Sequence, residues 1–184
     1  AAIETFCLNR KKMPLKDRIF SWIRQNIFIP DARLGWIPFA VREGARILQE
    51  EKPSVIFSSS PPHSLHLAAL RLSRKYQTPW VADFRDPWTE AFYEKGQARS
   101  TLSRRINAYF EQKVLRRAHA VLSVNSSILE LLYHQTPPGN AHAVPNGYDT
   151  EDFKLKKRQN DQFRIVYAGH LDSSQNPERF FAAL

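Results

Sequence analysis

The chain has 184 residues, of which 42% are hydrophobic and 24% charged, and this composition excludes a disordered or fibrous protein. No apolar run approaches the roughly 18–20 residues that span a bilayer, and the single cysteine, Cys7, excludes an intrachain disulfide. The net charge of +9 favours an anionic partner (a nucleic acid, a phosphorylated substrate or an anionic membrane surface), or else it only makes the surface soluble.

Hydrophobic periodicity predicts helices that alternate with short strands. The predicted helices cover residues 15–27, 38–51, 63–76 and 102–118, with another from about residue 127. The predicted strands are the apolar runs at residues 54–58, 79–83, 120–124 and 141–144. Because strand and helix alternate repeatedly, we predict an α/β fold with a parallel sheet, right-handed crossovers and helices on both faces.

A polar, charged stretch then interrupts this alternation. Residues 148–162 contain few apolar residues, which is typical of an interdomain linker. Residues 163–169 predict a new strand, followed by a turn and by a helix over residues 176–184. We therefore expect a first domain over residues 1–147, a linker over 148–162 and the start of a second domain over 163–184. Since the chain lacks an initial Met and closes inside a predicted helix, we expect it to be a fragment.

Three unusual segments follow predicted strands, where open parallel sheets bind their ligands. The first is SSSPP, residues 58–62. Its hydroxyls, and the free N–H groups at the next helix start, could hold a sugar hydroxyl or a phosphate. An equally weighted alternative is a serine cap with proline in the first helical turn.

The second segment places Asp83, Arg85, Asp86 and Trp88 within six residues of a strand end. A carboxylate there could orient or deprotonate a hydroxyl, and Trp88 could stack on a sugar face. The alternative is an internal Arg–Asp pair that braces a loop, and we favour the functional interpretation. No His or Cys lies close enough in sequence for a metal-ligand cluster.

The third segment contains Gly169 and His170, after the last predicted strand. A glycine there lets the backbone approach a phosphate, and a helix N-terminus favours an anion. One glycine falls short of the multi-glycine dinucleotide fingerprint.

Together these motifs resemble a known family. SSSPPHS and PWVADFRDPWT, within residues 53–89, closely resemble the N-terminal domain of bacterial family 4 glycosyltransferases. AHAVPNGYDTEDF (141–153) is similar to the segment before that family's linker, and FRIVYAGHLDSSQNPERFFAAL (163–184) to the start of its donor domain. The resemblance implies a GT-B architecture, in which two Rossmann-like domains face a cleft. The acceptor then binds mainly to the first domain and the nucleotide-sugar to the second.

The resemblance also implies roles for individual residues. Asp86 would be the acidic residue nearest the reacting centre. Asn146, Gly147, Gly169 and His170 would serve donor binding, the first two at the crossing between the domains and the last two at the donor phosphates. The acceptor side of the cleft would be lined by Ser58, Ser59, Ser60, Pro61, His63, Asp83, Arg85 and Trp88. No cofactor and no metal are expected, and the nucleotide-sugar is a co-substrate.

By this resemblance, the chain is part of an enzyme that moves a sugar from a nucleotide-sugar to a saccharide or lipid-linked acceptor. Such enzymes build bacterial cell-surface polysaccharides, including lipopolysaccharide, in the cytoplasm at the inner face of the plasma membrane. The basic, amphipathic first helix would suit peripheral contact with anionic lipid; alternatively, it docks on the sheet. Because the family's first strand, its glycine-rich loop and its donor-binding basic pair are not evident, we expect the isolated chain to be inactive.

Two other functions remain open. A sugar-nucleotide epimerase of the same architecture would need a cluster of acidic and histidine residues, which the sequence does not show. A basic nucleic-acid-binding module would suit the charge, but no recognition motif is present, and we expect no nucleic-acid partner.

Overall fold

The computed structural model describes residues 14–91, 98–152, 165–169 and 177–183. The chain divides into two units, and each is described by itself: the first unit here is Pro14–Gly147, and the second contains Tyr148–Leu184 together with Ala1–Met13. In the second unit, Thr150–Asp152 form a 3-10 turn and α7 spans Glu178–Phe181. The strand predicted over residues 163–169 is wrong for its described part, because Ile165–Gly169 pair with no other described strand.

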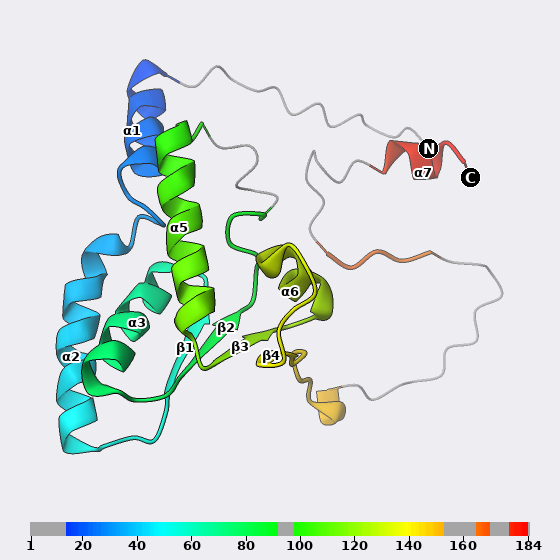
Figure 1. Cartoon of the computed structure of the whole chain (residues 1–184). Coiled ribbons are helices and arrows are strands. Elements are labelled where there is room, and N and C mark those ends of the chain that lie inside the picture. Colours follow the sequence, from blue (N-terminus) through cyan, green and yellow to red (C-terminus); the bar gives the residue numbers. More distant parts are fainter. Residues whose placement is uncertain (1–13, 92–97, 153–164, 170–176, 184) are drawn as a thin grey trace. The chain divides into compact units, whose positions relative to one another are not determined.

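A parallel sheet of four strands forms the centre of the first unit (Figure 1). Its strands are β1 (Ile56–Ser60), β2 (Trp80–Phe84), β3 (Ala120–Ser123) and β4 (Ala141–Ala143). Their order in the sheet, β1-β2-β3-β4, is their order in the chain. The predicted α/β fold is therefore confirmed, with each strand within two residues of its expected start.

Helices connect and flank these strands. They are α1 (Leu15–Asn26), a 3-10 turn (Leu34–Trp36), α2 (Ile37–Glu50), α3 (Ser64–Tyr76), α5 (Thr101–Arg117) and α6 (Ser126–Tyr133). Side-chain caps fix the starts of α5 and α6. Ser100 Oγ accepts a hydrogen bond from the Ser103 N–H at the start of α5, and Asn125 Oδ1 accepts one from the Ile128 N–H at the start of α6. Asn125, whose side chain satisfies an otherwise unpaired N–H group, begins α6 slightly earlier than the sequence predicted.

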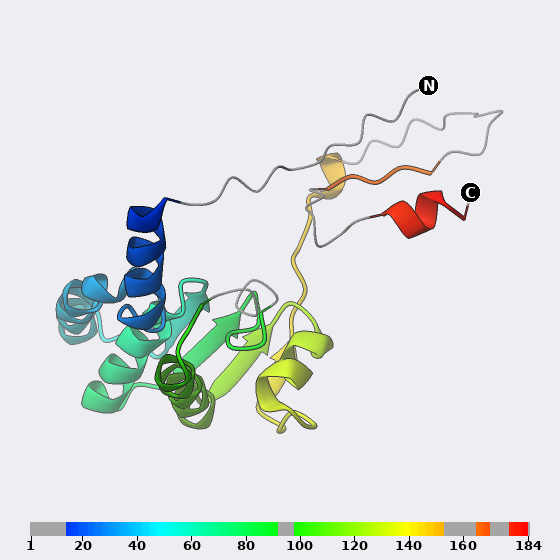
Figure 2. The same cartoon turned by 90° about the horizontal axis from the view of Figure 1, so that it is seen from above.

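The helices cover one face of the sheet. Because every crossover runs in the same direction along the sheet, α3, α5 and α6 lie on the same side (Figure 2). Trp80, Ala82 and Phe84 of β2 point into this layer and are fully buried. On the opposite face Phe57 is 59% exposed. We predicted helices on both faces of the sheet, but the described crossover helices cover one face only.

Polar and aromatic side chains are built into this core. The Trp80 indole N–H donates to Ser58 Oγ, and Ser58 Oγ lies 2.8 Å from His66 Nδ1. The His63 ring stacks on Trp88, with centroids 4.7 Å apart and planes 6° from parallel. Burial disfavours the charged imidazolium and lowers the pKa of His63 from 6.5 to about 4 and that of His66 to about 3.

A buried carboxylate fastens the chain after β2 to α5. Glu111 on α5 is 2% exposed, and its two oxygens accept from the Thr89 N–H (3.0 Å) and the Thr89 hydroxyl (2.6 Å). Burial raises the pKa of Glu111, while the bonds from Thr89 act in the opposite direction. These contacts fix where the segment that follows Asp86 and Trp88 can run.

The buried histidines predict acid sensitivity. Because the pKa of His63 is lowered on folding, the unfolded chain binds a proton first as the pH falls below 6.5. We expect the unfolding free energy of the wild type, relative to a His63→Phe variant that keeps an aromatic ring on Trp88, to fall by about 1.4 kcal/mol per pH unit between pH 6.5 and 4. Denaturant titrations of both proteins across this range test it, and a constant difference would contradict it.

The Glu111 anchor predicts a stability loss at one position of α5. Glu111→Ala removes two hydrogen bonds and leaves a cavity, so we expect unfolding to become about 2–4 kcal/mol easier. The matched control is Gln112→Ala, one position along the same helix, which should lose less than about 1 kcal/mol. Chemical denaturation at neutral pH measures both values; equal losses would show that the Thr89 contacts do not stabilise the fold.

Candidate functional site

A hydrogen-bonded network joins the carboxyl ends of three strands. Asp83, at the end of β2, is 6% exposed. Its Oδ2 accepts from Ser59 Oγ on β1 at 2.7 Å and from Arg85 Nε at 3.0 Å. Arg85 Nη1 in turn donates to Asn146 Oδ1, beyond β4. The structure thus brings together four residues that the sequence analysis had placed at the site.

The backbone completes this arrangement. The Arg85 N–H donates to the Ser60 carbonyl at 3.0 Å, and the Ser123 hydroxyl donates to the Phe84 carbonyl at 2.7 Å. Since a carboxylate and a guanidinium bind each other strongly when geometry is fixed, Asp83 holds Arg85 at the edge of the sheet. Arg85 remains about half exposed, so its side chain is accessible to a ligand.

Asp86 differs from Asp83 in its surroundings. It lies partly exposed in the bend after β2, and its carboxylate makes no hydrogen bond or ion pair with any described residue. The carboxylate of Asp83, by contrast, already accepts hydrogen bonds from Ser59 and Arg85. Of these two carboxylates, Asp86 is therefore the one available to accept a hydrogen bond or proton from a ligand hydroxyl.

Other candidates of the first two segments serve the core. Ser58 is hydrogen-bonded to Trp80 and His66 inside the core. Ser60 is buried, while Pro61 is exposed at the rim. His63 packs on Trp88, and both are buried.

The interpretation of Trp88 as a sugar-stacking residue does not fit the structure. The residue is 1% exposed, one face of its indole stacks on His63, and its N–H donates to Asn107 Oδ1 at 2.8 Å. No ring face is therefore open to a ligand. Trp88 instead holds the loop after β2 against α5.

Of the donor-side candidates, Asn146 is brought to this edge by its hydrogen bond from Arg85, and no described contact brings Gly147 or Gly169 there. Gly147 is exposed and directly follows Asn146 in the first unit. Gly169 belongs to the second unit, and His170 lies outside the described residues. The assignment of Asn146 and Gly147 to the donor side, and of Gly169 and His170 to the donor phosphates, stays a prediction.

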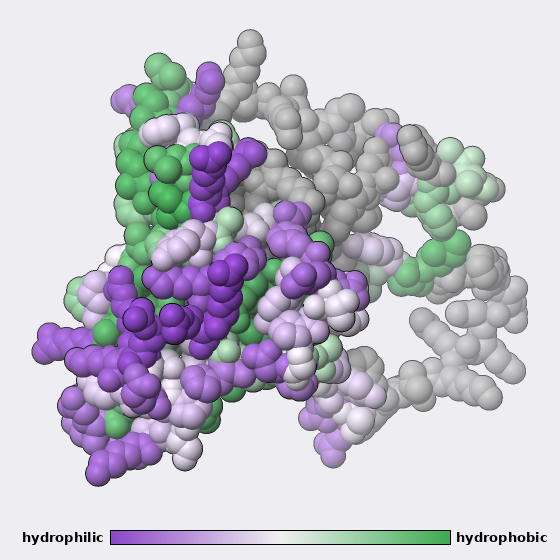
Figure 3. Space-filling model, in the orientation of Figure 1, coloured by the Kyte–Doolittle hydropathy of each residue, from purple (hydrophilic) through white to green (hydrophobic). Residues whose placement is uncertain are grey.

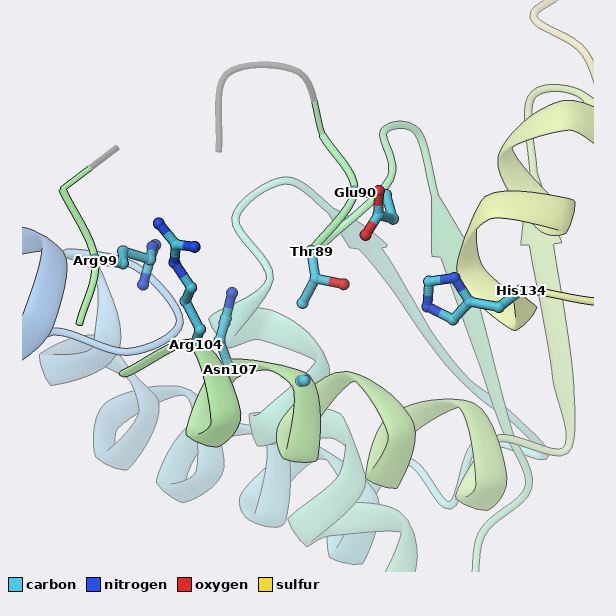
Figure 4. A pocket seen from close by; sticks show the side chains of 7 residues that line it. Thr89, Glu90, Arg99, Arg104, Asn107 and His134 are labelled. Atoms are coloured by element: carbon cyan, nitrogen blue, oxygen red, sulfur yellow. The ribbon is translucent and has the colours of Figure 1, made fainter. Parts of the chain in front are cut away.

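A pocket of about 520 Å³ adjoins the loop after β2 (Figure 4). Figure 4 shows Arg99 and Arg104 at one end, Thr89 and Glu90 above, and His134 at the other end. Asn107, whose Oδ1 is bonded to Trp88, lies in its lining. Sequence reasoning missed this pocket because its residues are far apart in the chain. The sequence signal that could have pointed to it is the arginines near the start of the predicted helix over 102–118, namely Arg99, Arg104 and Arg105.

Neither a metal centre nor a membrane-spanning helix is found in the described part of the chain. Across residues 14–91, 98–152 and the two short later stretches, no group of three His, Cys, Asp or Glu side chains is placed to hold a metal ion. In the same part of the chain, none of the helices has the length and apolar character needed to cross a membrane.

Comparison with models of protein families identifies the family of the chain. The sequence profile described as Glycosyltransferase Family 4 matches residues 3–152. No curated protein matches the chain. The matched range includes the whole sheet, the Ser59–Asp83–Arg85–Asn146 network and Asp86. A profile match over most of the chain, together with the α/β fold, establishes that the chain belongs to glycosyltransferase family 4.

Proposed function

We propose that the protein transfers a sugar from a nucleotide-sugar to a saccharide or lipid-linked acceptor in the synthesis of a bacterial cell-surface polysaccharide. Family membership supports the reaction class. The main structural support for the site is the Ser59–Asp83–Arg85–Asn146 network. Asp86 follows Arg85 directly in the chain, and its carboxylate has no hydrogen-bond partner among the described residues. We propose that the reaction takes place on the cytoplasmic side of the membrane, because that is the compartment in which the nucleotide-sugar donors are present.

In this proposal the carboxyl edge of the sheet binds the acceptor. Arg85, held by Asp83, presents N–H donors to acceptor oxygens, and Asp86 accepts a hydrogen bond from the acceptor hydroxyl that reacts. Such a bond orients the hydroxyl toward the sugar to be transferred. Gly147, Gly169 and His170 serve the donor, the last two at its phosphates. No metal or cofactor enters this proposal, in which the nucleotide-sugar is a co-substrate.

The test is product formation by the complete protein from a panel of nucleotide-sugars with saccharide and lipid-diphosphate-sugar acceptors. Transfer that requires both substrates supports the proposal. An epimerised sugar released without any acceptor would instead indicate the epimerase. Absence of both products, with tight and salt-sensitive binding to unrelated DNA and RNA, would indicate a nucleic-acid-binding protein.

Replacement of Asp86 tests its assigned role. Asp86→Asn keeps the shape of the side chain but removes its charge and basicity, so we expect kcat to fall by about 10²–10⁴-fold, with donor affinity unchanged. The control is Glu130→Gln, which makes the same chemical change at an exposed position of α6. Steady-state kinetics and donor titration separate the two effects. Full activity in Asp86→Asn would remove this residue from the site and leave the family assignment intact.

A further inference from the structure

The residues between α1 and α2 are fastened to the start of α3. The Asp31 carboxylate caps that helix: its Oδ2 accepts from the Ser64 N–H at 2.8 Å, and its Oδ1 accepts from the Ser64 hydroxyl at 2.9 Å. Asp31 Oδ1 also accepts from the Arg33 N–H at 2.9 Å. Because α3 begins soon after β1 ends, these bonds hold the 3-10 turn Leu34–Trp36 close to the segment that leaves the carboxyl end of β1.

Trp36, the last residue of this turn, is directed away from the core. Its neighbour Ile37 is 2% exposed, whereas Trp36 is 54% exposed. The Trp36 indole makes no ring contact and no hydrogen bond with any described residue. A single exposed apolar side chain is ordinary on a protein surface, so its meaning depends on what surrounds it.

The exposed indole belongs to a pocket of about 510 Å³, a volume typical of small-molecule sites. The pocket is lined by Ala32, Arg33, Gly35, Trp36, Pro62 and Leu65. Since Pro62 and Leu65 closely follow β1, the pocket adjoins the same edge of the sheet as the hydrogen bond between Ser59 and Asp83. It therefore extends the candidate site beyond the network described above.

The lining combines flat apolar surface with one cation. Arg33 is the only charged residue among the described lining residues, and its guanidinium has no hydrogen bond or ion pair with any of the described chain. The basic residues of α5 lie elsewhere, on the hydrophilic surface that Figure 3 shows along that helix. The pocket thus lacks the charge density that a polyanion requires. It suits a pyranose ring, because one face of the ring carries C–H groups that pack on an indole and its hydroxyl groups accept from a guanidinium.

We propose that this pocket is a second sugar subsite for the acceptor, in which Trp36 stacks on a pyranose ring and Arg33 donates to its hydroxyl groups. The inference rests on the proposed transferase function and extends it, because it makes the acceptor a chain of at least two sugars. The ring with the reacting hydroxyl meets Arg85 and Asp86 beyond β2, and the next ring lies over Trp36 beyond β1. Because neighbouring strands are about 4.8 Å apart, consecutive sugars of one chain reach both positions. The stacking role that the sequence assigned to the buried Trp88 falls to Trp36.

Saccharide binding by the complete protein tests the subsite without reliance on transfer. The probe is an array of immobilised mono- and oligosaccharides of bacterial surfaces. For the oligosaccharides that the wild type binds, Trp36→Ala should lower the affinity by about ten-fold or more, because the stacking surface is lost. The matched control is Trp22→Ala, which removes an indole of similar exposure, 51%, from α1 and should bind like the wild type.

A second variant, Gly35→Leu, blocks the pocket without removing a contact. A Cβ at Gly35 meets no atom within 4 Å, and no described glycine has a positive φ, so the turn accepts a side chain there. We expect a loss of oligosaccharide affinity of about ten-fold, because the leucine occupies space that the ring needs. Unchanged thermal unfolding confirms that each variant folds.

Kinetics connect the subsite to transfer. Trp36→Ala should raise the KM of acceptors with two or more sugars by about ten-fold and leave the KM of the donor and of a single-sugar acceptor unchanged. The inference is overturned if the wild type binds no oligosaccharide, if both pocket variants bind like the wild type, or if Trp22→Ala loses as much. It is also overturned if Trp36→Ala weakens only lipid-linked acceptors and not the same free saccharide, because the pocket then holds the hydrocarbon chain.

The two proposals fail in different ways. Oligosaccharide binding that is lost in Trp36→Ala, by a protein that transfers no sugar, would support the subsite and contradict the transferase. Transfer to oligosaccharides with an acceptor KM that Trp36→Ala leaves unchanged would support the transferase and contradict the subsite.

Discussion

The carboxylate of Asp83 is the interaction on which the candidate site depends. A nearly buried charge is costly unless it is paired and hydrogen-bonded, and here Ser59 and Arg85 supply both. Arg85 then reaches Asn146, so the ends of β1, β2 and the chain after β4 are held together. The same arrangement leaves Asp86 without a partner among the described residues. In the proposed reaction, Asp83 thus has the structural task and Asp86, three residues later, the chemical one.

The core and the surface of the domain support this edge in different ways. Beneath the loop after β2, Trp88 and Thr89 are fastened to α5 through Asn107 and Glu111. This anchoring limits the conformations that the loop can adopt, which favours a preorganised site. At the surface, the end of α1 is attached to the start of α5 and the residues before it through the side chain of Asn26. One helix, α5, therefore holds both the loop after β2 and the end of α1.

Much of the fold could be predicted from the sequence, because apolar periodicity directly reflects burial in a sheet with helices. The segments that carry the site were also recognisable, since Asp83, Arg85 and Asp86 crowd a strand end. Trp88 was misinterpreted because an aromatic residue in a polar loop looks the same in sequence whether it stacks on a ligand or fills the core. The pocket beside Thr89 could not be predicted from the sequence, because Arg104 and His134 are far from Thr89 in the chain and come near it only through tertiary packing. The sequence analysis also failed to predict that the described crossover helices all lie on one face of the sheet, because local sequence does not reveal the order of the strands.

The most direct test of the account is the separation of acceptor and donor effects at Arg85. Kinetics of the complete protein with Arg85→Ala should show an acceptor KM raised by about ten-fold or more, because the charged donors that face the acceptor are lost. The donor KM should stay unchanged. If the donor KM rises instead, or if neither changes, the carboxyl edge of this sheet is not where the acceptor binds, and the central claim is wrong.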